Sequence, residues 1–171
     1  MPFLGIGVDL VHVPRIAALI SRRPPQRFAS RILSVKELAE WKSLPPSSKS
    51  SVQFLAVRWC VKEAAYKAMY PVVKPTWKEI TYRGLTSQGH KPSIEYTSSN
   101  DDGTKIGRMH VSVSHDGDYV YSTVLVEGML HTLHISGRSY QRPRSSVKMT
   151  TLWLTSILPA KMSFPKYFLE K

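Results

Sequence analysis

The sequence predicts an α+β fold in which a small antiparallel sheet packs against one long central helix. Three observations support this prediction. Residues 54–68 contain neither Gly nor Pro and are rich in helix-forming residues. Residues 109–127 place two apolar, alternating segments around a turn, which is typical of a β-hairpin. A further apolar strand is expected at residues 5–11, and a chain with its helices early and its antiparallel strands late is typical of the α+β class.

The first predicted strand carries an acidic residue. Alternation places two sets of side chains on opposite faces, Ile6, Val8 and Leu10 on one and Gly7, Asp9 and Val11 on the other. Asp9 is the only acid in the first 36 residues. An acid inside an apolar strand must be paired, hydrogen-bonded or bound to a metal. Asp9 is therefore a candidate metal ligand, and the alternative is an aspartate that accepts hydrogen bonds from loop amides.

Three short helices are expected before the central helix. They are predicted at residues 14–21, 26–33 and 34–44. Pro14 marks the first of them, because proline is favoured in the first turn of a helix. Ser34 and Glu37 form a capping-box pattern at the start of the third. Residues 45–51 are rich in Ser and Pro and are expected to form a loop.

The central helix, residues 54–68, aligns its charged side chains. Residues three and four apart share a helix face, which gives one line of Trp59, Glu63 and Lys67 and a neighbouring line of Arg58 and Lys62. A carboxylate with cations one turn away suits a site for a metal ion and phosphates, because a hard cation takes oxygen ligands and phosphates take positive charges. The alternative is an ordinary amphipathic helix with a Glu-to-Lys pair, which is worth only a few tenths of a kcal/mol.

Short strands are predicted in the second half of the chain. They are expected at residues 79–83, 93–97, 109–113 and 119–127. The last two form the hairpin, around a tight turn at residues 114–118. In the final strand two sets of side chains alternate, Val120, Val124 and Val126 against Tyr119, Tyr121 and Leu125.

The formal net charge of +12 indicates an acidic partner, which is a nucleic acid, a membrane surface, a phosphorylated small molecule or an acidic protein. Residues 128–171 hold seven of the 24 Lys and Arg but only one of the 12 acids. This composition divides the chain into a folded domain at residues 1–127 and a basic C-terminal extension at residues 128–171, which is predicted to be poorly ordered.

The remaining features concern the compartment. Cys60 is the only cysteine, so an internal disulfide is excluded, and it is predicted to be a buried small residue in a reducing environment. No run of about 20 apolar residues is present, so no transmembrane helix is expected. The strand predicted from Gly5 leaves no room for a signal peptide.

Three motifs, taken in order, resemble those of the holo-acyl-carrier-protein synthases, the small trimeric class of phosphopantetheinyl transferases. Residues 5–11 resemble the first motif of that family. Residues 58–68 resemble its Trp-x-x-Lys-Glu-Ala-x-x-Lys motif, and residues 111–116 with Tyr119 resemble its third motif and closing strand. The resemblance covers residues 3–127 and implies the 4'-phosphopantetheinyl transferase fold.

The resemblance also implies a reaction and a site. Enzymes of this family transfer the 4'-phosphopantetheine group of coenzyme A to a serine of an apo acyl carrier protein and release adenosine 3',5'-bisphosphate. It implies that Asp9 and Glu63 bind Mg²⁺ and that Lys62, Lys67 and His115 contact the phosphates of the co-substrate coenzyme A. Glu63 and Lys67 would be catalytic, with the serine proton taken by Glu63 or by a metal-bound water.

The partners implied by the resemblance are proteins. Arg15, Arg27 and Arg31 match positions that contact the acidic helix of the carrier protein, and the alternative for each is ordinary surface charge. The family forms homotrimers with each active site between two subunits. No nucleic-acid or membrane partner is implied, and the compartment is expected to be the cytoplasm or the mitochondrion.

The sequence departs from the pattern of the resembled family at two places. His12 stands where many family members have an acid, which affects metal affinity if that acid supports the metal ligands. The extension at residues 128–171 has no counterpart in compact family members.

Two alternative functions are considered. One alternative is a nucleic-acid-binding module, which the net charge of +12 suggests. The other is a homologue that binds carrier proteins without catalysis.

Overall fold

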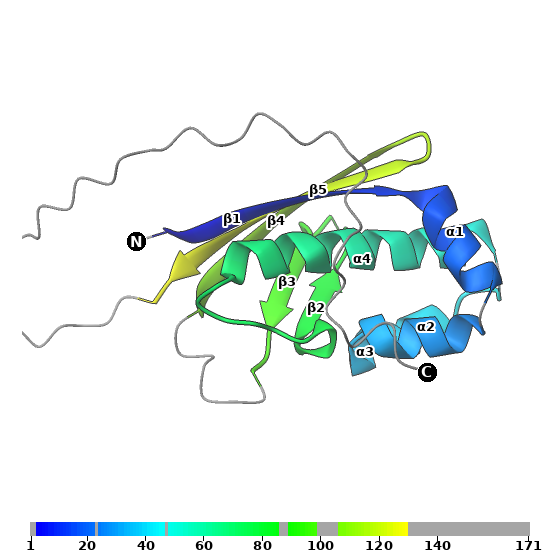
Figure 1. Cartoon of the computed structure of the whole chain (residues 1–171), viewed down its shortest axis with the longest axis horizontal. Coiled ribbons are helices and arrows are strands. Elements are labelled where there is room, and N and C mark those ends of the chain that lie inside the picture. The colour runs from blue at the N-terminus through cyan, green and yellow to red at the C-terminus, as the bar shows by residue number, and fades with distance from the viewer. Residues whose placement is uncertain (1–2, 23, 47, 86–88, 99–105, 130–171) are drawn as a thin grey trace, which may run out of the picture. The chain divides into compact units, whose positions relative to one another are not determined.

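A three-stranded antiparallel sheet and one long helix form the centre of the fold (Figure 1). The computed structural model describes residues 3–129 except for residues 23, 47, 86–88 and 99–105. In chain order the elements are β1 (Phe3–His12), α1 (Val13–Ser21), α2 (Pro25–Ile32), α3 (Val35–Lys42), α4 (Lys49–Met69), the 3-10 helix η1 (Trp77–Glu79), β2 (Ile80–Arg83), β3 (Ser93–Tyr96), β4 (Ile106–Asp116) and β5 (Tyr119–Gly128). The predicted α+β class is confirmed.

The main sheet has the strand order β1-β5-β4, and both of its pairings are antiparallel. Asp9 lies opposite Ser122 in this register. The predicted hairpin is confirmed, but β4 extends through Asp116, so the connection to β5 is shorter than the expected turn at residues 114–118. Gly117 has a φ of +53° in this connection, a left-handed conformation that glycine adopts without a steric penalty.

Helix α4 packs directly on one face of this sheet. Two glycines of β1 allow the close approach, because a Cβ on Gly7 would overlap the carbonyl oxygen of Ala64 and one on Gly5 would overlap that of Ala68. The side chains that fill this contact are small or β-branched and fully buried, namely Val61, Ala64, Ala65, Val124 and Val126. Backbone-to-backbone packing therefore fixes how β1 lies along α4.

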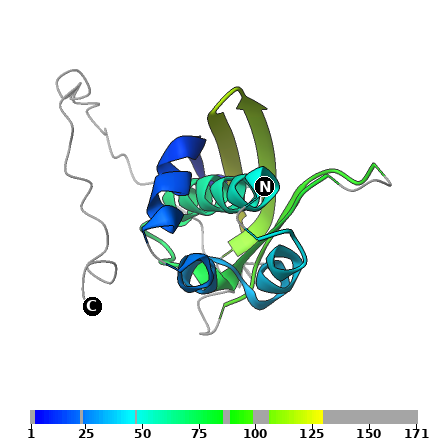
Figure 2. The same ribbon diagram turned by 90° about the vertical axis from the view of Figure 1, so that its right-hand side faces the viewer.

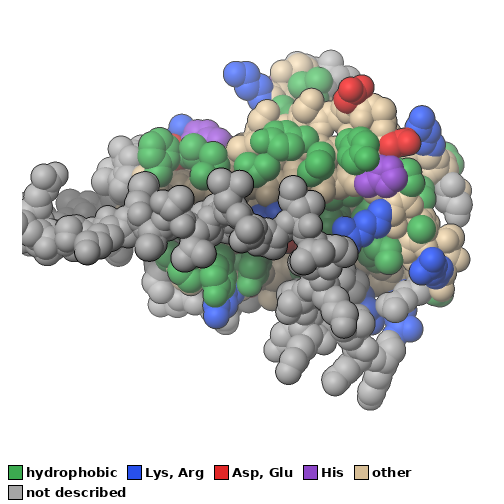
Figure 3. All heavy atoms as spheres, turned by 45° about the horizontal axis from the view of Figure 1, so that its top comes forward, with side chains coloured by type: hydrophobic (Ala, Val, Ile, Leu, Met, Phe, Trp, Pro, Cys, Tyr) green, Lys and Arg blue, Asp and Glu red, His purple; other side chains and the backbone are tan. Residues whose placement is uncertain are grey.

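None of the helices and strands that the structure describes covers the other face of the sheet, which we call the open face. The apolar set of β1 lies on this side, with Phe3, Ile6 and Leu10 each at least 60% exposed. Tyr119 and Tyr121 of β5 are also exposed, whereas Val120 and Val124 are buried against α4. Figure 3 shows hydrophobic side chains gathered on the sheet side of the molecule.

On its other side, α4 contacts a second layer. In Figure 2, α4 is seen end-on between the main sheet and the helices α2 and α3. The two-stranded sheet of β2 and β3 also lies on this side of α4 (Figure 1). Helix α4 is therefore buried from several directions, which is why its buried residues follow no single stripe.

Two helix starts depend on serine caps. The capping box at α3 is confirmed, because Ser34 accepts a hydrogen bond from the amide of Glu37, and Glu37 accepts one from the amide of Ser34. The predicted loop at residues 45–51 is wrong in part, since α4 already begins at Lys49. The side chain of Ser48 accepts a hydrogen bond from the amide of Ser51 and caps the additional turn.

Within the part of the chain that the structure describes, no helix is long and apolar enough to cross a membrane. The predicted basic extension, residues 128–171, lies outside the described residues from position 130 onward.

Candidate active site

The candidate site begins where β1 passes α4, at Asp9. The Lys67 Nζ donates hydrogen bonds to the Asp9 Oδ1 at 2.8 Å and to the Val8 carbonyl oxygen at 2.9 Å. The Asp9 side chain is 11% exposed, whereas that of Lys67 is 47% exposed. The acid in the apolar strand is therefore ion-paired, and the lysine that pairs with it remains open to an incoming ligand.

Glu63 faces the same group of charges from one turn earlier in α4. Burial raises the pKa of the Glu63 carboxyl, and the negative charge of Asp9 raises it further, while Lys67 and Arg15 act in the opposite direction. Helix α1 thus adds Arg15 to the charges contributed by β1 and α4. The structure brings together Asp9, Glu63, Lys67 and Arg15, four residues that the sequence placed in three separate segments.

Two neighbouring carboxylates on a partly open surface suit one kind of metal ion. Mg²⁺ is commonly held by one or two carboxylates, with water and substrate phosphates completing its octahedron. Among the described residues, no group of three or more His, Cys, Asp and Glu side chains is arranged to hold a metal ion. Burial is the larger cause of the raised pKa of Glu63, and the smaller contribution, repulsion by Asp9, is one that a bound cation would relieve, so Asp9 and Glu63 fit a Mg²⁺ site.

Cys60 lies beneath this site and is inert. Its Sγ lies 3.3 Å from the carbonyl oxygens of both Asp9 and Val120 and 3.2 Å from the Ser122 Oγ. Burial raises the pKa of the Cys60 thiol to about 11, so the thiolate is scarce at neutral pH. The prediction that Cys60 is a buried small residue is confirmed.

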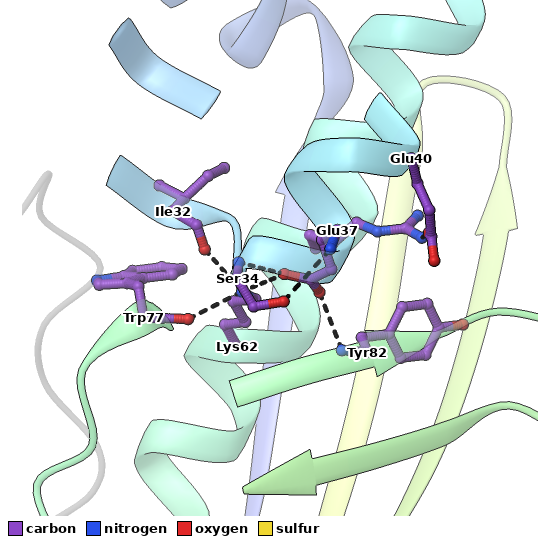
Figure 4. A network of polar contacts seen from close by, with 8 residues as sticks. Ile32, Ser34, Glu37, Glu40, Lys62, Trp77 and Tyr82 are labelled. Carbon is purple, nitrogen blue, oxygen red and sulfur yellow. Dashed lines mark hydrogen bonds and ion pairs between the residues drawn. The ribbon is translucent and has the colours of Figure 1, made fainter. Parts of the chain in front are cut away.

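The prediction that Lys62 contacts coenzyme A phosphates is wrong for this structure. Its side chain is 0% exposed, and its Nζ donates to the Glu37 Oε2 at 2.6 Å, the Ile32 carbonyl oxygen at 2.6 Å and the Trp77 carbonyl oxygen at 2.8 Å (Figure 4). An ammonium group has three donors, and all three are used. Burial lowers the pKa of Lys62, while the adjacent Glu37 carboxylate opposes this effect.

His115 lies apart from the acidic pair within one chain. It sits near the end of β4, exposed and in register with Val120, which is itself in register with Val11 of β1. Neighbouring strands are about 4.8 Å apart, so His115 lies roughly 10 Å from β1. His12 is likewise not a neighbour of the Asp9 carboxylate, because alternation puts it on the open face, where its ring lies 4.9 Å from that of Tyr119.

The two predicted carrier-contacting arginines of α2 lie together on that helix. Arg27 is exposed and Arg31 is half-buried, four residues apart. The opposite side of α2 is buried through Phe28 and Ile32. Phe28 stacks on Trp59 of α4 with ring centroids 5.6 Å apart, so α2 packs one turn before Glu63.

Glu37 is the residue that sequence reasoning missed. Glu37 fits the capping-box pattern and also the pattern of the resembled family, but neither signal indicated that the same carboxylate would bind Lys62 and the amide of Tyr82. A lysine and a glutamate 25 positions apart give no periodic signal.

Comparison with known proteins identifies the family. The family model described as the 4'-phosphopantetheinyl transferase superfamily matches residues 5–124. A mitochondrial 4'-phosphopantetheinyl transferase B of Aspergillus fumigatus is 36% identical over 146 residues, which cover 73% of this chain and 94% of that protein. A holo-[acyl-carrier-protein] synthase of Geobacillus kaustophilus is 33% identical, with coverage of 72% and 88%.

Solved structures show the same fold. The crystal structure of a holo-[acyl-carrier-protein] synthase from Neisseria meningitidis superposes with a TM-score of 0.59 at 32% identity and covers 73% of this chain and 98% of that one. A holo-(acyl-carrier-protein) synthase from Bacillus anthracis in complex with CoA (3',5'-ADP) has a TM-score of 0.59 at 25% identity, with coverage of 75% and 100%.

Proposed function

The chain belongs to the 4'-phosphopantetheinyl transferase superfamily, and we propose that it is a holo-[acyl-carrier-protein] synthase. It transfers the 4'-phosphopantetheine group of coenzyme A to a serine of an apo acyl carrier protein. The serine Oγ–phosphorus bond forms, a phosphoanhydride P–O bond of coenzyme A breaks, and adenosine 3',5'-bisphosphate leaves. The observation that carries this proposal is the meeting of Asp9, Glu63 and Lys67 at one place between β1 and α4.

In the proposed mechanism, Asp9 and Glu63 would hold Mg²⁺, and the bound cation would supply charge neutralisation and orientation of the pyrophosphate. Lys67 then exchanges its contact with Asp9 for one with a substrate phosphate and stabilises the charge that develops on the leaving group. Glu63 would accept the serine proton, directly or through a water molecule. Its position beside Asp9 and Lys67 at the same site favours this role, because a general base must lie within reach of the proton that it takes.

The carrier protein is proposed to bind along the arginines of α1 and α2. Arg15 lies on α1, and Arg27 and Arg31 lie on α2. An acidic helix of the carrier would be steered towards these positive charges, which speeds association at low ionic strength. Affinity for the carrier that did not fall with rising salt would contradict this assignment.

The open sheet face supports the proposal that the protein is a homotrimer. Phe3, Ile6, Val8, Leu10, Tyr119 and Tyr121 are all exposed on this sheet. A soluble monomer rarely leaves such a contiguous apolar surface in water, and a second and third copy of this chain would bury it. A site between subunits would also give His115 a role, because it could then serve the pyrophosphate in the neighbouring subunit's site.

Replacing Ile6 by Lys is expected to convert the trimer into a folded monomer. The Ile6 side chain is 64% exposed in the single chain, and a lysine in the buried centre of an assembly would carry an unpaired charge. Light scattering coupled to gel filtration measures the mass. Val35→Lys is the matched control, since Val35 is 86% exposed but lies on α3. A trimeric Ile6→Lys variant, or a monomeric parent protein, would contradict the proposal.

A mass-spectrometric assay tests the function itself. The full chain is incubated with an apo acyl carrier protein, coenzyme A and Mg²⁺, and the expected result is a mass gain of one phosphopantetheine group on the carrier. EDTA should abolish the gain, because the phosphates then lack a neutralising cation. Carrier binding without any mass gain, across several carriers, would instead indicate a non-catalytic binding homologue.

We propose the cytoplasm or the mitochondrion as the compartment. The Aspergillus fumigatus relative is named as mitochondrial, and the bacterial relatives support the cytoplasm as the other possibility. Cell fractionation with an antibody against the chain distinguishes the two, and recovery of the protein in a secreted fraction would contradict both.

A further inference from the structure

We propose that the buried Glu37–Lys62 ion pair positions α2, the proposed carrier-binding helix, at a fixed distance from the catalytic residue Glu63. This inference rests on the proposed function, because α2 carries two of the arginines assigned to the carrier. Lys62 and Glu37 touch neither substrate in this role. They act by fixing the distance between the place where the carrier binds and the place where its serine reacts.

The ammonium group of Lys62 ties three elements to α4. It donates to the carbonyl of Ile32 at the end of α2, to the carboxylate of Glu37 in α3 and to the carbonyl of Trp77 in η1. Figure 4 shows these three acceptors converging on one nitrogen from separate elements. A methylene chain could fill this space, but only a cation supplies three directed hydrogen bonds.

Glu37 extends the same connection on its other side. Its Oε1 accepts from the amide of Tyr82 in β2 at 2.9 Å, and its Oε2 accepts from the amide of Ser34 at 2.8 Å as well as from Lys62. Both oxygens of the carboxylate are therefore hydrogen-bonded, and the side chain is 1% exposed. One ion pair thus joins α2, α3, η1 and β2 to the central helix.

The pair stands beside the catalytic and binding residues in the sequence. Lys62 directly precedes Glu63, and Ile32 directly follows Arg31. A single hydrogen bond, from the Lys62 Nζ to the Ile32 carbonyl oxygen at 2.6 Å, thus connects the residue after Arg31 with the residue before the proposed metal ligand Glu63. The Phe28–Trp59 stack holds α2 at a second point, but a ring stack fixes position less strictly than a directed hydrogen bond.

Stability alone does not require a charged pair at this place. Replacing a buried ion pair by apolar residues of similar volume is often neutral or stabilising, because desolvation offsets much of the Coulombic attraction. What the pair adds is a defined arrangement of the surrounding elements. A variant that loses the pair is therefore expected to lose the alignment of α2 before it loses the fold.

The test is a comparison of Michaelis constants in Lys62→Met and in the double variant Lys62→Met/Glu37→Gln. The double variant removes both charges of the pair, leaves Arg58 its ion pair with Glu40 and keeps an acceptor for the amide of Tyr82, so it is the one expected to fold well. In both, KM for the apo carrier should rise on the order of tenfold, while KM for coenzyme A stays within about twofold. Lys78→Met in η1 is the matched control, since it removes an exposed lysine from the same neighbourhood.

A second readout does not depend on catalysis. Amide hydrogen exchange of residues 25–32 should be faster in both variants than in the parent protein, while exchange in the middle of α4 stays slow. If the parent protein proves inactive on every carrier, the proposed function fails, but this measurement still decides whether the pair positions α2.

Three results would overturn the inference. A selective rise in KM for coenzyme A would mean that Lys62 reaches the phosphates after all. A lower melting temperature with both Michaelis constants unchanged would mean that the pair is only structural. Unchanged exchange in α2 in the folded double variant would mean that the Phe28–Trp59 stack alone positions the helix.

Discussion

Replacing Glu63 by Gln is expected to reduce transfer by at least about 10³-fold while the fold stays intact. The substitution conserves volume but removes one of the two negative charges proposed to hold Mg²⁺. It also removes the proposed acceptor of the serine proton. The measurement is the rate of phosphopantetheine gain on an apo carrier at saturating coenzyme A and Mg²⁺.

The same variant should not be less stable than the parent protein when metal is absent. Burial and the Asp9 charge raise the pKa of Glu63, so the folded state binds a proton more tightly than the unfolded state does. The free energy of unfolding therefore falls as the pH rises from the ordinary pKa of a glutamate to the raised pKa of Glu63. Glutamine removes that cost, so at pH 7 with EDTA the melting temperature of Glu63→Gln should equal or exceed that of the parent.

A control with the same change in charge separates the loss of transfer in Glu63→Gln from a general effect of removing one negative charge. Glu95→Gln removes an exposed carboxylate from β3, on the other sheet, and should transfer at the parental rate. Parental activity in Glu63→Gln would remove the proposed metal site. A large fall in its metal-free melting temperature would instead mean that the Glu63 carboxylate has a structural partner.

The elements of the fold were largely readable from the sequence because their signals are local. The capping box of Ser34 and Glu37 predicted the start of α3, and the alternation around Val124 predicted the pairing of the hairpin. The beginning of α4 was misplaced because serine is favoured both in loops and at helix caps. Nothing local distinguishes Ser48, which caps the helix, from the residues around it.

The direction in which side chains point was harder to predict. A helix with one apolar stripe shows its buried face in the sequence, but α4 is covered by the sheet on one side and by α2, η1 and β2 on the other. In the sequence, the helix face that carries Lys62 therefore looked as exposed as the face that carries Lys67. In the structure the Lys62 side chain is buried and the Lys67 side chain is exposed. Only the partner, Glu37, decides between them, and it lies 25 residues away.

The first strand illustrates the same difficulty in a sheet. Hydrophobicity alone would turn Ile6, Val8 and Leu10 towards the core, yet these side chains are exposed and the face with Gly7 and Asp9 meets α4. The glycines decide this, because the helix backbone comes this close to β1 only at Gly5 and Gly7, where no Cβ is present. The apolar side chains of β1 therefore lie on the exposed outer face of the sheet.

Replacing Gly7 by Ala is accordingly expected to be among the most damaging single changes in the domain. The added Cβ would overlap the Ala64 carbonyl oxygen and lie 2.7 Å from the Ala68 nitrogen, and these are backbone atoms that cannot rotate away. Either β1 separates from α4 or the helix shifts. We expect a loss of at least about 3 kcal/mol in the free energy of unfolding, measured by urea denaturation.

The loss should extend to the chemistry, because Asp9 follows Gly7 by two residues and reaches Lys67 only while β1 lies against α4. The fraction of Gly7→Ala that remains folded should therefore need more Mg²⁺ for half-maximal transfer. Gly84→Ala is the control, since the nearest atoms to its added Cβ are those of the Tyr82 ring at 3.9 Å. If Gly7→Ala were as stable and as active as Gly84→Ala, the close approach of β1 to α4 could not be what assembles the site.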